Sequence, residues 1–149
     1  MSNPIEGYKK VGEAKLEIFF LDIYRSELYT QTGDYQPNEF PQALKIHYLR
    51  NIKAIDLVDR TEQEWQKLGV SQDDIDSWIS KLKPIWPDIR KNNELLLVVN
   101  EVGQSHFYFD NKPIGSIADS SFGPNFLRIW LDEKSSYPDL RKQLIGASK

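Results

Sequence analysis

The chain has 149 residues, of which 40% are hydrophobic and 28% are charged, with a net charge of −3 and no cysteine. This length is sufficient for a core without disulfide or metal cross-links, so we expect one domain over residues 1–149. The absence of cysteine excludes disulfides and thiolate nucleophiles, and the dispersed basic residues do not form the positive stripe that nucleic acid requires.

Two features of the sequence bear on location. No run approaches the roughly 20 apolar residues that a membrane-spanning helix needs. The first residues, Met1 to Tyr8, lack the apolar segment of a signal peptide. We therefore expect either a cytoplasmic protein or an exported one from which a leader has been removed.

The N-terminal half begins with two expected strands. Apolar side chains occupy both faces of the segment 18–23, which predicts that residues 12–29 form a central strand covered on both sides. Thr32-Gly33-Asp34 supplies the residues of a turn. Strict alternation then predicts a second strand over residues 43–50.

Helical spacing replaces this alternation from Lys53 onward. One stripe over residues 53–68 is apolar and the opposite side is charged, which predicts an amphipathic helix with Ile55, Val58, Trp65 and Leu68 buried and Glu62, Glu64 and Lys67 in water. Ser71, followed by Asp74, is expected to cap a second helix that ends before Pro84.

The C-terminal half repeats the pattern of strands followed by helices. Strands are expected over residues 95–99, 106–109 and 113–117, with Gly103 and Asp110-Asn111 in the connections, and helices over residues 122–131 and 138–144. The order of strands, two helices, strands and two helices predicts an α+β fold. In it, helices pack on one face of a large antiparallel sheet.

Sequence motifs for cofactors and metals are missing. The chain contains no GxGxxG, no phosphate-binding loop and no GxSxG elbow. Neither His47 nor His106 has a second ligand at helical spacing, and the acidic cluster at residues 73–76 fits the start of a helix better than a calcium loop. We therefore expect no cofactor and no metal site.

Asp22 is the least ordinary residue of the first strand, because apolar residues flank it on both sides. A buried carboxylate must find a partner or shift its pKa upward, so Asp22 is expected either in a salt bridge or as an acid in a pocket. Tyr24 lies two residues further and is expected on the same face of the strand.

Lys15, Tyr48 and Arg50 form a second group of candidates. Lys15 belongs to the first strand, while Tyr48 and Arg50 share a face if the second strand continues to residue 50. Arginine and tyrosine projecting from a sheet can hold a ligand carboxylate, although an arginine at a strand end is more often solvated. These three residues, with Asp22 and Tyr24, are the candidate ligand-binding residues.

Several segments resemble the bacterial chalcone isomerase-like family, in matching order and spacing over residues 12–146. They are residues 11–15, 19–29, 44–50, 85–88, 106–109, 114–115 and 122–131. The resemblance implies the chalcone isomerase fold, an open-faced β-sandwich in which helices cover one face of an antiparallel sheet. Bacterial relatives are often exported behind a leader, which implies a periplasmic location.

The resemblance also implies two classes of function. Plant chalcone isomerases cyclise a chalcone with an arginine and a threonine, and the positions that match these here carry Lys15 and Phe19. Related members without catalytic activity bind fatty acids through an arginine and a tyrosine. We therefore expect a protein that binds a small hydrophobic acid and is not an active chalcone isomerase. The alternatives are an isomerase that uses Tyr24 and Lys15, and a partner-binding module.

Overall fold

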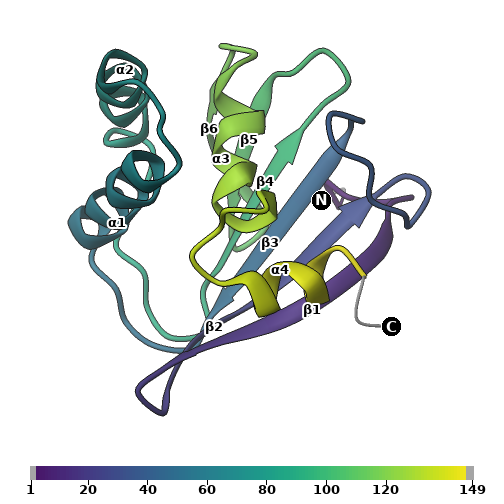
Figure 1. The fold of residues 1–149 in the computed structure, drawn as a ribbon, viewed down its shortest axis with the longest axis horizontal. Helices are drawn as coiled ribbons and strands as arrows, with labels where there is room; N and C mark the ends of the chain where they lie inside the picture. The colour runs from purple at the N-terminus through teal and green to yellow at the C-terminus, as the bar shows by residue number, and fades with distance from the viewer. Residues whose placement is uncertain (1–2, 147–149) are drawn as a thin grey trace.

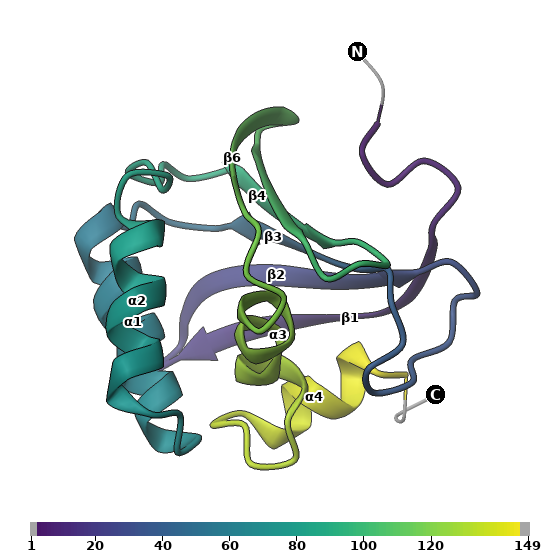
Figure 2. The ribbon, with the colours of Figure 1, turned by 90° about the horizontal axis from the view of Figure 1, so that it is seen from above.

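Six antiparallel strands form one sheet, in which every strand lies beside its neighbour in sequence (Figure 1). The computed structural model describes residues 3–146. The strands are β1 (Lys9–Ile18), β2 (Leu21–Thr30), β3 (Gln42–Tyr48), β4 (Glu94–Val99), β5 (Ser105–Phe109) and β6 (Lys112–Ile117). The helices are α1 (Ala54–Lys67), α2 (Gln72–Leu82), α3 (Phe122–Leu131) and α4 (Pro138–Leu144). Figure 2 shows all four helices on one side of the sheet, which confirms the expected α+β architecture.

The strand expected over residues 12–29 is in fact a hairpin. β1 and β2 pair with each other through a turn at Phe19 and Phe20, so β1 is an edge strand and not a central one. The apolar residues that suggested two covered faces lie at this turn, where their side chains project from the protein. Phe19 is 91% and Phe20 100% exposed. The prediction that this segment is covered on both sides was therefore wrong.

Helix α1 begins and ends where the sequence predicted, but two of its side chains point differently. Ile55, expected in the core, lies in the first turn and is 64% exposed. Glu64, expected in water, is 5% exposed, because hydroxyl and cationic neighbours contact its carboxylate. Helix α2 has the predicted cap, since the Ser71 side chain accepts a hydrogen bond from the Asp74 backbone N–H.

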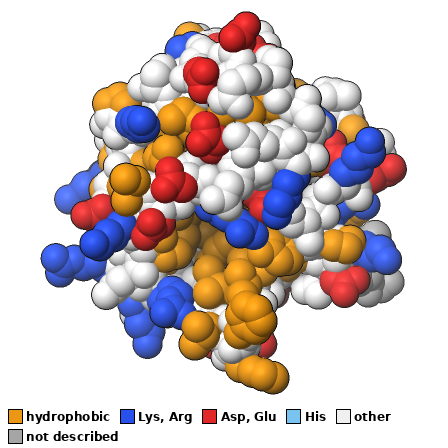
Figure 3. Space-filling model, turned by 60° about the vertical axis from the view of Figure 1, so that its left-hand side comes forward, with side chains coloured by type: hydrophobic (Ala, Val, Ile, Leu, Met, Phe, Trp, Pro, Cys, Tyr) orange, Lys and Arg blue, Asp and Glu red, His pale blue; other side chains and the backbone are white. Residues whose placement is uncertain are grey.

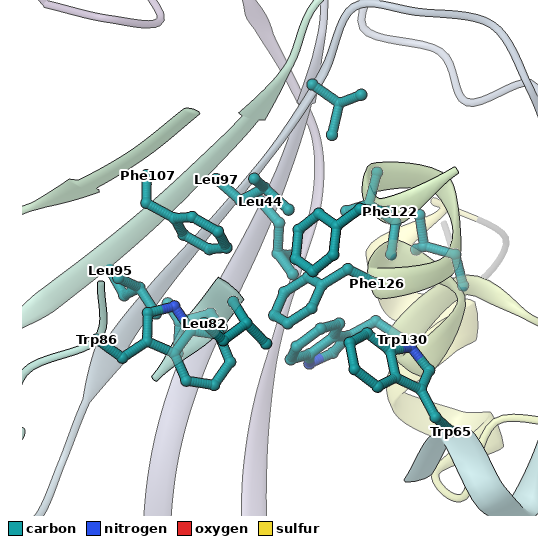
Figure 4. Packing of buried hydrophobic residues seen from close by; sticks show 14 of the residues in the cluster. Leu44, Trp65, Leu82, Trp86, Leu95, Leu97, Phe107, Phe122, Phe126 and Trp130 are labelled. Carbon is teal, nitrogen blue, oxygen red and sulfur yellow. The ribbon is translucent and has the colours of Figure 1, made fainter. Parts of the chain in front are cut away.

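Aromatic rings from three helices and the sheet form the centre of the core (Figure 4). The Trp65 and Trp78 ring centroids lie 5.1 Å apart, and Phe122 stacks on Phe126 at 5.5 Å. Aromatic pairs at these separations add to the free energy gained by burying their area. This cluster fixes α1, α2 and α3 over the inner face of the sheet.

Asp119 ties the loop after β6 to this cluster. Its carboxylate accepts a hydrogen bond from the Ser121 backbone N–H and another from the buried Trp78 indole at 3.1 Å. These hydrogen bonds lower the pKa of Asp119 below its ordinary value of 3.8. The carboxylate therefore stabilises the fold above that pH, and the contribution is lost as the pH falls through the lowered pKa.

We expect Asp119→Ala to lower the free energy of unfolding by about 1–3 kcal/mol at neutral pH, because the Trp78 N–H is left buried without its acceptor. Urea unfolding monitored by tryptophan fluorescence measures this. Asp119→Asn is the control, since it keeps an acceptor oxygen but removes the charge. A loss that is as large at pH values well below 3.8 as at neutral pH would contradict the assignment.

Candidate functional site

An apolar cavity of about 220 Å³ lies between the inner face of the sheet and the helices. Its apolar lining comes from β1 to β4, α1, α3, α4 and two connections: Leu16, Ile18, Ile23, Ile46, Ile52, Leu57, Trp86, Leu95, Phe126, Ile129, Trp130 and Leu140. Its polar lining is Tyr24, Tyr48, Asp56, Arg60, Thr61, Glu64, Ser135 and Tyr137. Figure 3 shows a hollow with apolar side chains below it and charged side chains around its upper rim.

Two tyrosines on neighbouring strands reach this cavity. Tyr24 of β2 and Tyr48 of β3 are partners in the register, and their rings meet edge to face with centroids 6.1 Å apart. The Tyr24 hydroxyl accepts a hydrogen bond from the Trp130 indole N–H at 2.9 Å. Tyr48 is 4% exposed, and its hydroxyl forms no hydrogen bond with any residue in the range 3–146.

Burial raises the pKa of both phenols above the ordinary value of 10. Both are therefore protonated at neutral pH, and each can donate its O–H to a ligand. A folded state that holds these protons more tightly than the unfolded chain is fully stabilised below pH 10. That stabilisation is lost as the pH rises toward the raised pKa values.

We expect the free energy of unfolding to fall as the pH rises from about 9 to about 11, and to fall less in Tyr48→Phe, which has one buried phenol fewer. Urea unfolding across this range measures the difference. Phenolate absorbance of the folded protein provides a second readout, in which part of the seven tyrosines should resist ionisation. If the free energy of unfolding falls equally with pH in the wild type and in Tyr48→Phe, the Tyr48 phenol is not buried as described by the structure.

A network of polar side chains closes one side of the cavity. Glu64 accepts a hydrogen bond from the Ser136 hydroxyl at 2.6 Å, and its other oxygen lies 3.2 Å from the Arg60 guanidinium. Arg60 also donates to the Tyr137 hydroxyl at 2.7 Å. These contacts join α1 to the segment between α3 and α4, and they pair the charge of Arg60 with a carboxylate at the edge of the cavity.

The structure brings two of the five predicted ligand-binding residues to this cavity, Tyr24 and Tyr48. Arg50 is not one of the lining residues. β3 ends at Tyr48, so Arg50 falls in the bend after the strand, where it is exposed and does not share the face of Tyr48. The expectation that the strand continues to residue 50 was therefore wrong.

Lys15 and Asp22 lie together on the outer face of the hairpin. Their charged groups are 3.1 Å apart, and both side chains are exposed. The expected burial of Asp22 was wrong, because β2 contains one extra residue, Ile23, between two pairs of the register. Such a bulge resets the alternation, so that Asp22 and Tyr24 point to opposite faces. The Asp22 carboxylate raises the pKa of Lys15, which stays protonated.

A second hollow, of about 380 Å³, lies beside the loop between β2 and β3. Its lining is more polar, and two of its cations already have partners within the chain. Arg128 contacts Asp132 at 2.9 Å, and Arg141 donates to the Leu131 carbonyl at 2.8 Å. We place the candidate site in the smaller cavity, because apolar walls with a few converging donors are typical of ligand sites.

Residues 3–146 contain neither a cluster of metal-ligating side chains nor a membrane-spanning helix. Within residues 3–146, no three His, Asp or Glu side chains are grouped closely enough to hold a metal ion. None of the helices in that range has both the length and the apolar character needed to cross a bilayer.

Comparison with known proteins identifies the family. The profile of a family described as chalcone isomerase-like matches residues 12–146. The chain belongs to the chalcone isomerase-like family. This confirms the resemblance found in the sequence.

Two further similarities were found, one in sequence and one in structure. An uncharacterized protein of Haemophilus influenzae is 25% identical over 146 residues, which are 98% of this chain and 72% of that protein. The crystal structure of a fatty-acid binding protein of Arabidopsis thaliana has 13% identity and a TM-score of 0.72, over 99% of this chain and 93% of that one. This structural likeness shows that the two chains share a fold.

Proposed function

We propose that this protein binds a small hydrophobic acid, whose apolar part fills the cavity and whose oxygen accepts a hydrogen bond from Tyr48. The observation that carries the proposal is the Tyr48 hydroxyl, a donor that lines an apolar cavity and has no partner in the described chain. This hydroxyl opens on the cavity and not on a protein acceptor, so a ligand oxygen would supply the acceptor that it lacks. The fatty-acid binding protein of the same fold supports this class of ligand.

The size and charge of the cavity narrow the ligand class. At about 220 Å³ the cavity is smaller than the roughly 300–1,000 Å³ of sites for drug-sized molecules, so a short acyl chain or a single aromatic ring is the better fit. Tyr24 offers a second O–H, whereas Arg60 at the edge of the cavity is already paired with Glu64. Two neutral O–H donors suit the oxygens of a carboxylic acid head group.

An isomerase that uses Tyr24 and Lys15 is not supported by this arrangement. Lys15 projects from the outer face of the hairpin, whereas Tyr24 lines the cavity on the inner side. The raised pKa of Tyr24 also disfavours a phenolate base near neutral pH. The two side chains therefore do not meet at one substrate.

Calorimetric titration with decanoic acid and with octanoic acid tests the binding proposal. We expect Tyr48→Phe to weaken binding about tenfold or more, because it removes the O–H that meets a charged acceptor. Tyr29→Phe is the matched control, since the Tyr29 hydroxyl bonds Glu27 away from the cavity. Ile23→Trp places a large ring at a half-buried position in the lining and should also weaken binding. Absence of binding in the wild type, or equal affinity in Tyr48→Phe, would reject the proposal.

The periplasmic location implied by the sequence resemblance stays a prediction. Fractionation of the producing cells, followed by immunodetection of the protein, is the measurement that tests it.

A further inference from the structure

The tip of the β1–β2 hairpin exposes two adjacent aromatic rings. Phe19 is 91% and Phe20 100% exposed, and Leu21 beside them is 51% exposed. The hairpin extends beyond the rest of the sheet at the bottom of Figure 1. No other pair of adjacent residues in the described chain exposes two large hydrophobic side chains to this extent.

The backbone of this tip is unfavourable for the residues that it carries. Phe19 has a φ of 50° and Phe20 a φ of 67°. Two-residue hairpin turns with positive φ at both positions strongly prefer Asn-Gly or similar pairs, because larger side chains are strained there. Rings that are almost fully exposed gain little packing to offset this strain. Strain of this kind accumulates at functional sites, which points to a function of the rings outside the folded core.

The tip is continuous with the lining of the cavity. Ile18 precedes the two phenylalanines and Ile23 follows them by three residues, and both contribute to the cavity wall. In Figure 3 the apolar side chains form one band from the hollow to the projecting end at the bottom of the view. A molecule leaving the cavity along this band would pass the exposed rings.

We propose that Phe19 and Phe20 insert into the surface of a lipid assembly, so that the cavity exchanges its hydrophobic ligand directly with that surface. This inference rests on the proposed function, to which it adds the source of the ligand. Two phenylalanine rings offer at most about 500 Å². A stable protein–protein interface buries about 800 Å² on each partner, so the tip alone is too small to hold a second copy or another protein.

The charges beside the tip indicate which kind of lipid surface fits. Lys15 lies within 3.3 Å of both Glu17 and Asp22, and Arg25 adds a second cation on the same face. Two cations and two carboxylates balance, so this face has no net attraction for anionic headgroups. We therefore assign the tip to a zwitterionic surface, such as phosphatidylcholine, where association depends on the rings and not on charge.

Flotation of the protein with phosphatidylcholine vesicles tests this assignment. We expect the wild type to float with the vesicles, with little change on adding salt or anionic lipid. The double substitution Phe19→Asn, Phe20→Gly should reduce the floated fraction at least about tenfold, because both rings are lost. The same change supplies the residues that the turn prefers, so its resistance to urea should rise and misfolding cannot explain the loss. Val102→Ser is the matched control, since Val102 is 72% exposed in the loop between β4 and β5 and should not affect flotation.

Measuring each variant in both the binding assay and the flotation assay distinguishes the two proposals. Phe19→Asn, Phe20→Gly should still bind decanoic acid in solution, whereas Tyr48→Phe should lose acid binding and still float. If the wild type does not float with the vesicles, or if the wild type and the tip variant float to the same extent, the lipid assignment is wrong. Neither result would affect the proposal that the cavity binds an acid. A concentration-dependent dimer that the tip variant cannot form would also overturn it, because the rings would then serve self-association.

Discussion

Trp65→Ala is expected to lower the free energy of unfolding by about 3–5 kcal/mol, the range for removing a large buried aromatic side chain. Trp65 has no exposed surface, and its ring centroid lies 5.1, 6.1 and 6.3 Å from those of Trp78, Phe122 and Phe126 in the centre of the core (Figure 4). Its indole N–H also donates to the Asn125 carbonyl at 3.0 Å, which links α1 to α3. The substitution removes this hydrogen bond and leaves a cavity where three helices meet.

Urea unfolding followed by far-ultraviolet circular dichroism measures this loss, and the melting temperature should fall by roughly 10 °C or more. Trp65→Phe is the graded control. It keeps much of the packing but not the N–H, so its loss should be clearly smaller. A loss under about 1 kcal/mol for the alanine variant would mean that the neighbouring rings move to fill the space, contrary to the tight packing around Trp65.

Gly12→Ala is expected to destabilise the protein by about 3 kcal/mol, at the upper end of the range for overpacking. Gly12 lies on β1 where α4 crosses it, and an added Cβ would stand 2.6 Å from the Leu144 carbonyl oxygen and closer still to that of Gln143. These are backbone atoms, so they cannot rotate away as a flexible side chain would. Either α4 must move from β1 or the strand must bend.

A local effect on α4 would distinguish the Gly12→Ala variant from one that is destabilised uniformly. Hydrogen exchange should increase most in residues 138–144, and acid binding should weaken because Leu140 of α4 lines the cavity. Glu13→Ala, at the exposed neighbouring position, is the control and should cost well under 1 kcal/mol. Unchanged exchange in α4 would show that Gly12 does not set the distance between the helix and the strand.

Elements with clear local signals were predictable from the sequence. Ser71 caps α2 as expected, Gly103 takes the positive φ of the β4–β5 turn, and Asp110-Asn111 forms the tight turn before β6. The Ser71 side chain supplies the acceptor that the helix start needs, while Gly103, Asp110 and Asn111 have a positive φ that few other residues adopt easily. Antiparallel strands and helices between such signals then determine the fold class.

The first hairpin was missed because its turn carries no such signal. Phenylalanine is typical of strands, whereas the positive φ of Phe19 and Phe20 is usually found at asparagine and glycine. The error then propagated to Asp22, whose predicted burial depended on an uninterrupted strand. A bulge at Ile23 cannot be read from alternation alone.

Two polar residues of the candidate site could be predicted from the sequence. Tyr24 and Tyr48 were selected from strand alternation, and the register brings them together. Arg60 and Glu64 were not, because their roles depend on how α1 is rotated and on Ser136, which is 72 residues from Glu64 in the sequence. A carboxylate on the edge of a helical stripe is usually solvated, and only the packed loop reverses that expectation.

The simple order of the strands has a consequence for how the protein is made. Because each strand pairs with the next one along the chain, the sheet can assemble while the ribosome is still at work, and it is complete once Ile117 has emerged. The apolar inner face of the sheet, however, is not fully covered until α3 and α4 have also been synthesised. A nascent chain interrupted in that interval would therefore carry a finished sheet with an unfinished cover, and would be a client for chaperones and not a partly working protein.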